Sequence, residues 1–344
     1  MKDILQKISK GIELGQSEID AVIFGLKEDC FSQAQIAGFL MALLMKGPTV
    51  GEITAIVRAM RKACIPVSPK IEEELVDTCG TGGGLTTFNV STANALLAAA
   101  AGVKIAKHGS RSISASSGSA DVLEALGIEV ELEPAQAERL LEETGFSFLY
   151  APYFHPVMMK VFGPENDLGI KTIFFTIIGP LINPAGAKRH LLGVYQPKLL
   201  QQVAEVAAEL DFSHVMVVHG ADGLDEISPL GETLVAEVKH GSISSYTITP
   251  EELGMRRCTF EQLRGGTPQD NARIILDIFS GKEQGPRRDM LLLNAGATLF
   301  IAGKAPSLRE GVDLAQKTLD SGEALAKLQE VRLMSQKLKG VAVN

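Results

Sequence analysis

The feature that most constrains the fold is a repeated pattern of strand, turn and helix that begins after Pro69. Residues 74–78 form a predicted strand, residues 80–84 a glycine-rich turn, and residues 91–101 a helix rich in Ala and Leu. Strands that alternate with helices build a mostly parallel sheet flanked by helices on both faces. The sequence therefore predicts an α/β fold, in which ligands bind at the carboxyl ends of the strands.

The same pattern continues along the chain. Further predicted elements are strands at 103–106, 146–150, 190–195 and 215–218, and helices at 120–126 and 197–210. Residues 236–238 and 243–248 are predicted to pair as an antiparallel hairpin at an edge of the sheet. From about residue 268 the pattern is helical again.

The first 68 residues predict helices only, because apolar side chains recur at intervals of three and four residues. Thr49 and Glu52 form a capping box that opens the last of these helices. A unit of roughly 65 residues is small for an independent core. We therefore expect it to pack on the rest of the chain or on a second copy, and we predict a homo-oligomer.

Length and composition limit the class of protein. The 344 residues suggest about two domains. A net charge of -8 offers no general attraction for nucleic acid, so we expect small-molecule partners. The longest nearly unbroken apolar stretch, residues 36–45, is half of the roughly 20 residues that cross a bilayer, which predicts a cytoplasmic protein without a membrane partner. With 5% aromatic residues and no Trp, we expect any aromatic ligand to be held mainly by polar and aliphatic groups.

Three predicted loops carry candidate binding residues, and the first is the glycine-rich turn. Backbone N–H groups of such a turn, followed by the start of a helix, can bind a phosphate. The turn lacks both the Lys-Ser/Thr end of a Walker loop and the spacing of a dinucleotide fingerprint. On local sequence alone, a flexible turn explains it equally well.

The second loop, residues 107–119, is rich in Ser and Gly and contains Lys107 and Arg111. These side chains and backbone groups suit several phosphate oxygens at once, although a solvated polar loop is the alternative. The third loop contains the adjacent carboxylates Asp225 and Glu226. They suit Mg²⁺ that bridges to phosphates, and an ordinary acidic turn is the alternative.

Taken together, these motifs resemble the anthranilate phosphoribosyltransferase family over nearly the whole chain. The matching segments are residues 80–83, 89–92, 107–111, 117–121, 179–184 and 225–226. The resemblance implies a fold of the nucleoside phosphorylase type, with a helical domain at 1–70 completed by about 155–185 and an α/β domain at 71–154 and 186–344. It also implies a homodimer through the helical domains, phosphoribosyl pyrophosphate as donor, anthranilate as acceptor, and Mg²⁺ as cofactor.

The resemblance assigns roles to individual residues and names no general acid or base. It implies donor binding by Gly80, Gly83, Thr87, Asn89, Ser91, Thr92, Lys107 and Ser119, with Gly84 and Gly109 in the same loops. It implies that Ser91, Asp225 and Glu226 hold magnesium. It places His108 at the acceptor pocket.

The chain departs from the family pattern at several of these positions. The glycine loop lacks the family's Asp and is one residue shorter, and Ser110 and Ser116 replace an Asn and a Lys. Glu165 stands where the family has an Arg that contacts the anthranilate carboxylate, and a glutamate there would repel that group.

Three hypotheses follow from the departures. The first is an anthranilate phosphoribosyltransferase in which Arg111 or backbone donors hold the carboxylate. The second is a paralogue that uses another aromatic or heterocyclic acceptor. The third is a relative without catalysis that binds nucleotides or nucleic acid, which the acidic net charge and the Asp225-Glu226 pair disfavour.

Overall fold

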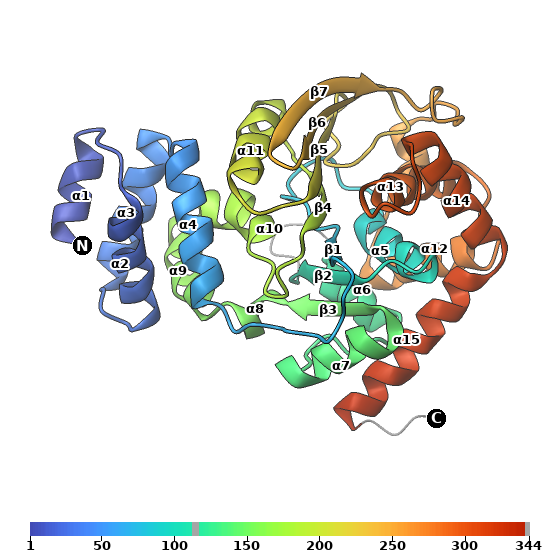
Figure 1. The fold of residues 1–344 in the computed structure, drawn as a ribbon, viewed down its shortest axis with the longest axis horizontal. Coiled ribbons are helices and arrows are strands. Elements are labelled where there is room, and N and C mark those ends of the chain that lie inside the picture. The colour runs from blue at the N-terminus through green and yellow to red at the C-terminus, as the bar shows by residue number, and fades with distance from the viewer. Residues whose placement is uncertain (112–116, 341–344) are drawn as a thin grey trace.

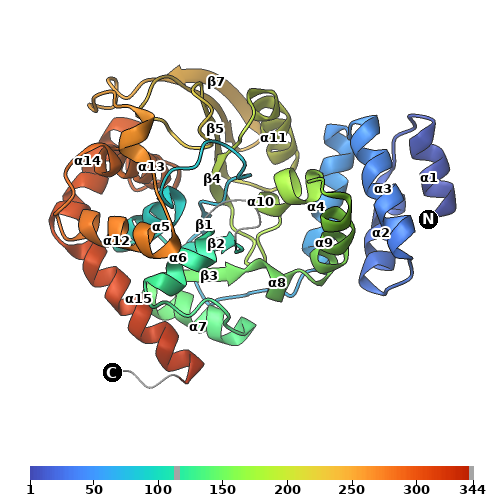
Figure 2. The same ribbon diagram turned by 180° about the vertical axis from the view of Figure 1, so that it is seen from behind.

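The computed structural model describes residues 1–111 and 117–340, with a helical unit at one end of an α/β unit (Figures 1 and 2). The helical unit begins with α1 (Lys2–Ser9), α2 (Gln16–Lys27), α3 (Gln33–Lys46) and α4 (Val50–Ala63). The predicted capping box is present: Thr49 Oγ1 accepts a hydrogen bond from the Glu52 N–H at 3.2 Å, and Glu52 Oε2 accepts one from the Thr49 N–H at 3.0 Å. The prediction that this segment is helical is therefore confirmed.

One seven-stranded sheet organises the α/β unit, in the order β3-β2-β1-β4-β5-β6-β7. Its strands are β1 (Val76–Asp77), β2 (Ile105–Gly109), β3 (Phe146–Tyr150), β4 (Arg189–Gly193), β5 (His214–Gly220), β6 (Thr233–Lys239) and β7 (Ser242–Ile248). Strands β1 to β5 pair in parallel, whereas β6 and β7 form an antiparallel hairpin at the edge. The predicted α/β fold and its edge hairpin are confirmed.

Helices cover both faces of the sheet, and a separate apolar core lies on each face. Leu191 belongs to one core and its neighbour Leu192 to the other, because successive side chains of a strand point to opposite faces. The helices of the α/β unit are α5 (Val90–Ala100), α6 (Ser119–Ala125), α7 (Pro134–Thr144), α11 (Pro197–Glu209), α12 (Pro268–Phe279), α13 (Pro286–Ile301), α14 (Leu308–Asp320) and α15 (Glu323–Lys339), with a 3₁₀ turn at Phe260–Leu263. Helix α7 is absent from the predicted elements.

A middle segment of the chain returns to the helical unit after β3 (Figure 1). It contains α8 (Ala151–Phe154), α9 (Pro156–Leu168), the π-helix η1 (Phe174–Ile178) and α10 (Gly179–Leu181). Phe174 of this segment packs edge-on against Phe39 of α3, with ring centroids 6.5 Å apart. The apolar core of the helical unit continues into the core on one face of the sheet, so no break in the core marks a domain boundary. The boundaries proposed near residues 70, 154 and 186 therefore stay predictions.

Packing inside the molecule accounts for the apolar faces of the longest helices. Leu291, Leu292 and Leu293 of α13 are all fully buried. In the part of the chain that the structure describes, no helix has both the length and the apolar character needed to cross a membrane. All four cysteines are free thiols.

Candidate active site

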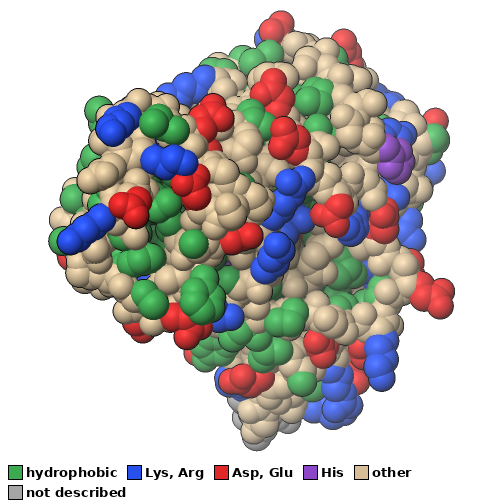
Figure 3. Space-filling view, turned by 60° about the vertical axis from the view of Figure 1, so that its left-hand side comes forward, with side chains coloured by type: hydrophobic (Ala, Val, Ile, Leu, Met, Phe, Trp, Pro, Cys, Tyr) green, Lys and Arg blue, Asp and Glu red, His purple; other side chains and the backbone are tan. Residues whose placement is uncertain are grey.

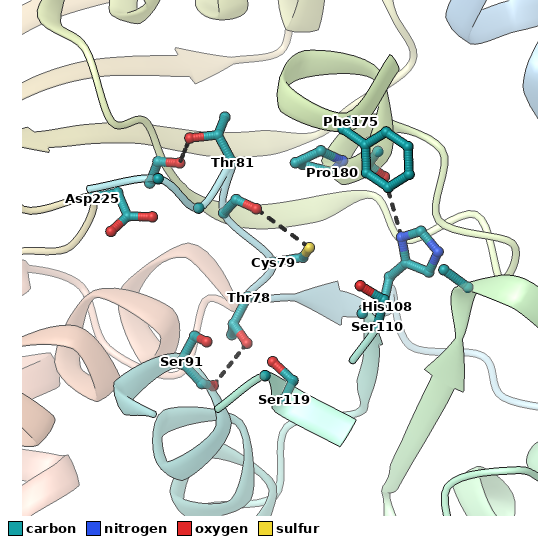
Figure 4. Close-up of a pocket in the computed structure, with 18 of the residues that line it drawn as sticks. Thr78, Cys79, Thr81, Ser91, His108, Ser110, Ser119, Phe175, Pro180 and Asp225 are labelled. Atoms are coloured by element: carbon teal, nitrogen blue, oxygen red, sulfur yellow. Dashed lines mark hydrogen bonds between the residues drawn. The ribbon is translucent and has the colours of Figure 1, made fainter. Parts of the chain in front are cut away.

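A cavity of about 630 Å³ opens at the carboxyl ends of β1, β2 and β4, where the predicted loops meet (Figure 4). All of the predicted binding and metal residues line it except Thr92 and Glu165. Sheets of this kind bind their ligands at this edge, and a cavity of this volume suits a small molecule. We therefore identify it as the candidate active site.

The glycine loop packs directly on the acidic turn. Gly82 and Gly83 have positive φ angles of 62° and 93°, which favour glycine. A Cβ on Gly84 would lie 2.8 Å from Asp225 Oδ1, and the Leu85 N–H donates a hydrogen bond to the Gly223 carbonyl at 3.2 Å. A merely flexible turn would not require this close approach, so the binding interpretation of the loop is favoured.

Asp225 and Glu226 receive backbone hydrogen bonds from two different elements. The Gly82 N–H donates to Asp225, and the Ser91 N–H at the start of α5 donates to Glu226. Burial raises the pKa of Asp225. Burial and the neighbouring Asp225 together raise the pKa of Glu226 to about 8, because two close carboxylates resist carrying two negative charges.

The acidic pair fits a magnesium ion that is shared with a substrate. Among the described residues, no three His, Cys, Asp or Glu side chains converge to hold a metal by themselves. Magnesium commonly takes one or two carboxylates and completes its coordination with substrate oxygens and waters. The two half-buried carboxylates and the Ser91 hydroxyl match that need, and a divalent cation would relieve the repulsion between the carboxylates.

Lys107 places a cation in the half of the cavity that contains Asp225 and Glu226. Its side chain is 1% exposed, and its Nζ donates hydrogen bonds to Thr78 Oγ1 and Ser91 Oγ, each at 3.3 Å. Within the described part of the chain, no carboxylate lies within ion-pair distance of this ammonium group. A buried cation without an acidic partner is costly unless a ligand supplies the negative charge.

Arg111 lines the cavity, but its charge is already satisfied by the protein. Its guanidinium donates to Glu124 Oε1 at 2.6 Å and to Glu131 Oε1 at 3.2 Å, and it stacks 5.6 Å from the centroid of the Tyr150 ring. It also pairs with Asp121 at 3.4 Å. The structure therefore does not support the prediction that Arg111 holds donor phosphates or the acceptor carboxylate.

Two other predicted binding residues lie away from the cavity. Thr92 is 0% exposed within α5 and does not line the cavity, so its assignment to donor binding stays a prediction. Glu165 is 5% exposed, and its Oε1 accepts a hydrogen bond from the Thr172 N–H at 2.6 Å. The repulsion expected between Glu165 and an acceptor in the cavity is therefore not supported. Ser116 lies outside the described residues.

Asn89 lines the cavity, and its side chain also connects three elements. Its Oδ1 accepts hydrogen bonds from Ser117 Oγ at 3.0 Å and from Asn271 Nδ2 at 2.8 Å, and its Nδ2 donates to the Ser117 carbonyl at 3.3 Å. These bonds link the start of α5 to the second loop and to α12. Asn89 therefore positions the loops around the donor half of the cavity.

Sequence reasoning missed the wall opposite the glycine loop. This wall is formed by Tyr150, His155, Met158, Met159, Phe162, Lys171, Phe175 and Pro180. Figure 4 shows Phe175, Pro180 and His108 on the side opposite Ser91 and Asp225. The rings of Phe162 and Phe175 pack 5.7 Å apart in this wall, beside polar and aliphatic side chains, so the expectation about how an aromatic ligand is held stays a prediction.

Asp77 is a further residue that the sequence analysis did not single out. It is 0% exposed at the end of β1, and its Oδ1 accepts hydrogen bonds from the backbone N–H groups of Thr78, at 2.7 Å, and His108, at 3.2 Å. Its Oδ2 accepts one from Asn183 Nδ2 at 2.7 Å. Through these hydrogen bonds, Asp77 connects the first two loops to the segment that ends in Asn183.

A pair of buried histidines lies beneath the apolar wall. His108 and His155 are 3% and 1% exposed, and their rings are 4.9 Å apart. His108 Nδ1 lies 3.2 Å from the Gly179 carbonyl, which can only accept, so Nδ1 carries the proton. Burial lowers the pKa of His108 to about 4, so the ring is neutral near pH 7, and its Nε2 has no hydrogen-bond donor among the residues that the structure describes.

We expect the free energy of unfolding to fall as the pH drops from about 6.5 toward 4. Burial lowers the pKa of His108 to about 4 from 6.5, and it also lowers the pKa of His155 and His190. The unfolded chain binds protons in this range that the folded protein does not, so stability is complete above pH 6.5 and is lost as the pH falls. His108 alone contributes about 3 kcal/mol over the whole range.

Denaturant unfolding at pH 7 and pH 4.5 measures this loss. His108→Gln should reduce the difference between the two pH values, because the glutamine does not titrate. An equal difference in the variant and the parent would contradict the assignment to His108.

Comparison with known proteins agrees with the geometry. Residues 72–325 match the a/b domain of the glycosyl transferase family, and residues 2–64 match its helical bundle domain. The anthranilate phosphoribosyltransferase of Methanosarcina acetivorans is 46% identical over 333 residues, which cover 96% of this chain and 89% of the relative.

Solved structures agree as well. The crystal structure of anthranilate phosphoribosyltransferase from Thermus thermophilus has a TM-score of 0.91 and 42% identity, over 97% of this chain and 99% of that one. The Saccharomyces cerevisiae enzyme in complex with phosphoribosyl pyrophosphate and Mg has a TM-score of 0.87 and 28% identity, over 97% of each chain. Its complex with 4-fluoroanthranilate has a TM-score of 0.86 and 27% identity, over the same shares.

The fold combines a helical bundle with an α/β sheet, and one cavity holds a glycine loop, a buried cation and an acidic pair. Together with the two matched domains, these features define a glycosyltransferase. The identities extend over nearly the whole chain, so they are not limited to one domain. The chain belongs to the anthranilate phosphoribosyltransferase family and is a phosphoribosyl-transferring enzyme.

Proposed function

We propose that this enzyme transfers phosphoribose from phosphoribosyl pyrophosphate to the amine of anthranilate in tryptophan biosynthesis, with magnesium bound by Ser91, Asp225 and Glu226. The observation that carries the proposal is the arrangement of one half of the cavity: a buried cation, two half-buried carboxylates and a glycine loop meet there. Phosphate groups and a metal ion bound together would satisfy all three.

The donor is proposed to lie between the glycine loop and the start of α5. Backbone N–H groups of the loop and the ammonium group of Lys107, which forms no ion pair among the described residues, can bind phosphate oxygens. Asn89, Thr87 and Ser119 contribute polar groups around the same half. When bound, magnesium would neutralise part of the negative charge of the leaving pyrophosphate.

The acceptor is proposed to lie against the apolar wall. Among the described residues, His108 Nε2 is a buried acceptor without a partner, so it can accept a hydrogen bond from an amine N–H. This contact would orient the anthranilate amine toward the ribose carbon that the pyrophosphate leaves. The neutral ring also avoids placing a positive charge beside the electron-poor carbon that forms in the reaction.

An assay with purified protein tests the proposal. Protein, Mg²⁺, phosphoribosyl pyrophosphate and anthranilate are mixed, and loss of anthranilate fluorescence and release of pyrophosphate are followed together. We expect both signals to change at equal rates. No change in fluorescence, with normal donor binding by calorimetry, would reject anthranilate as the acceptor, and the same pyrophosphate assay would then identify another aromatic acceptor.

We also propose that two copies associate through their helical units. Phe24 on α2 is 64% exposed and Met45 on α3 is 78% exposed, and large apolar side chains at such positions often mark an interface. Figure 3 turns this end of the molecule forward and shows hydrophobic side chains among charged ones on its surface.

Sedimentation across a range of concentrations tests this association. We expect a dimer for the parent protein and a monomer for the double variant Phe24→Asp, Met45→Asp. Leu333→Asp on α15, where the residue is 43% exposed, is the matched control and should leave the dimer intact. A parent protein that is monomeric at every concentration would refute the proposal.

A further inference from the structure

We propose that Asn271, a residue outside the cavity, sets the orientation of the Asn89 side chain and thereby determines how tightly the donor binds. Asn271 lies near the start of α12, 182 residues from Asn89 in the sequence. It is 2% exposed and does not line the cavity, so it acts on a substrate only through another residue. The inference rests on the proposed function for the identity of the donor, phosphoribosyl pyrophosphate.

The backbone of Gly266 determines which way round the Asn271 amide lies. The Gly266 N–H, which can only donate, bonds to Asn271 Oδ1 at 2.8 Å. The Gly266 carbonyl, which can only accept, receives a hydrogen bond from Asn271 Nδ2 at 3.4 Å. An amide turned the other way would lose both bonds and bring like groups together. Nδ2 is therefore the atom that Asn271 presents to Asn89.

The Asn271 amide in turn determines the orientation of Asn89. Asn271 Nδ2 donates to Asn89 Oδ1 at 2.8 Å, and Ser117 Oγ donates to the same oxygen at 3.0 Å. One N–H of Asn89 Nδ2 donates to the Ser117 carbonyl at 3.3 Å. The second N–H has no acceptor among the residues that the structure describes, and Asn89 lines the cavity. This N–H is therefore left for an oxygen of the donor.

The turn before α12 also packs against the backbone that leads to Asn89. A Cβ on Gly265 would lie 2.8 Å from the Phe88 Cα and 2.8 Å from the Thr87 carbonyl oxygen. No side chain fits at this separation, because protein interiors are close-packed. The turn therefore supports the backbone of the segment whose side chain Asn271 orients.

The test uses Asn271→Asp, which keeps the shape of the side chain and removes its N–H groups. Two oxygens without a proton between them would then face each other, so the Asn89 amide must turn or move. We expect calorimetry to show that phosphoribosyl pyrophosphate with Mg²⁺ binds about 30-fold more weakly, because a hydrogen bond to a charged phosphate is lost. The KM for the donor should rise in parallel, while kcat at saturating donor changes little.

A double-mutant cycle shows whether Asn271 acts through Asn89. Asn89→Ala removes the N–H itself and should weaken donor binding by a similar factor. Adding Asn271→Asp to Asn89→Ala should then cost no further donor affinity, because the contact through which Asn271 acts is gone. Losses that multiply in the double variant would overturn the positioning role.

Ile275→Ala is the matched control, because Ile275 lies one turn further along α12, is fully buried and does not line the cavity. It should lower the free energy of unfolding and leave donor affinity unchanged. If donor affinity instead followed stability in both variants, the role of Asn271 would be structural only and the inference would be overturned.

Two further outcomes are decisive. Asn271→Asp with the donor affinity of the parent protein would overturn the inference and leave the proposed function intact. A parent protein that does not bind phosphoribosyl pyrophosphate in the presence of Mg²⁺ would reject the proposed donor, and the inference with it. Because calorimetry of the donor needs no acceptor, neither result depends on whether anthranilate is the acceptor.

Discussion

Replacing Asp225 with Asn, or Glu226 with Gln, is expected to lower kcat on the order of 10³-fold, the upper range for loss of one preorganised electrostatic group. The two carboxylates are adjacent, half-buried and held in place by the Gly82 and Ser91 N–H groups. Each substitution removes a metal ligand and leaves the leaving pyrophosphate less neutralised. Steady-state turnover at saturating donor and magnesium measures the effect.

The control for this prediction is another acidic residue on the same side of the sheet. Glu232 is exposed and does not line the cavity, so Glu232→Gln should keep the parent's turnover. The free energy of unfolding should not fall in the Asp225 and Glu226 variants, because each substitution relieves the repulsion that raises the pKa of Glu226. Turnover within ten-fold of the parent in both variants would show that the pair is not the metal site.

The sheet and the loops of the donor half could be predicted because local sequence determines them. Apolar strands, each followed by a turn, repeat along the chain, and parallel pairing places their carboxyl ends at one edge of the sheet. Glycines at 82 and 83 indicate a positive φ, and the structure has one at each position. Helix α7 was missed although Ala137, Leu140, Leu141 and Thr144 follow a helical period and are buried.

The partners and the orientation of a charged side chain depend on residues that are distant in the sequence. For this reason two predicted contacts, those of Arg111 and Glu165, were not supported. Arg111 is neutralised by Glu124 and Glu131, which lie 13 and 20 residues away. Glu165 points away from the cavity because α9 turns its side chain toward Thr172. The spacing of residues in the sequence predicts which helix or strand carries a residue. It does not predict which face of that element is turned toward the cavity.

The acceptor wall was missed for a related reason. Its residues come from β3, α9 and η1, and no single stretch of sequence contains the pattern. Met158, Met159 and Phe162 do share one face of α9 at helical spacing, which was the available signal. Such a stripe is ordinarily core, and only the return of α9 beside the sheet brings it to the cavity.

Lys107→Met is expected to weaken binding of phosphoribosyl pyrophosphate roughly 10²-fold without lowering the stability of the fold. Lys107 is 1% exposed, and among the described residues its ammonium group donates hydrogen bonds to the hydroxyls of Thr78 and Ser91 alone. In the folded protein without ligand, this buried charge is unfavourable, and an apolar side chain of similar length removes the cost. With the donor bound, the same charge pairs with phosphate, so the residue is retained for binding.

Calorimetry of donor binding and denaturant unfolding, made on the same preparations, separate these two effects. Lys104→Met is the matched control, since Lys104 lies just before β2, is half-buried and does not line the cavity. It should leave donor affinity unchanged. If Lys107→Met instead lowered stability and left donor affinity intact, the ammonium group would be a structural donor to Thr78 and Ser91, and the phosphates would have to be held by the loop amides and the metal alone.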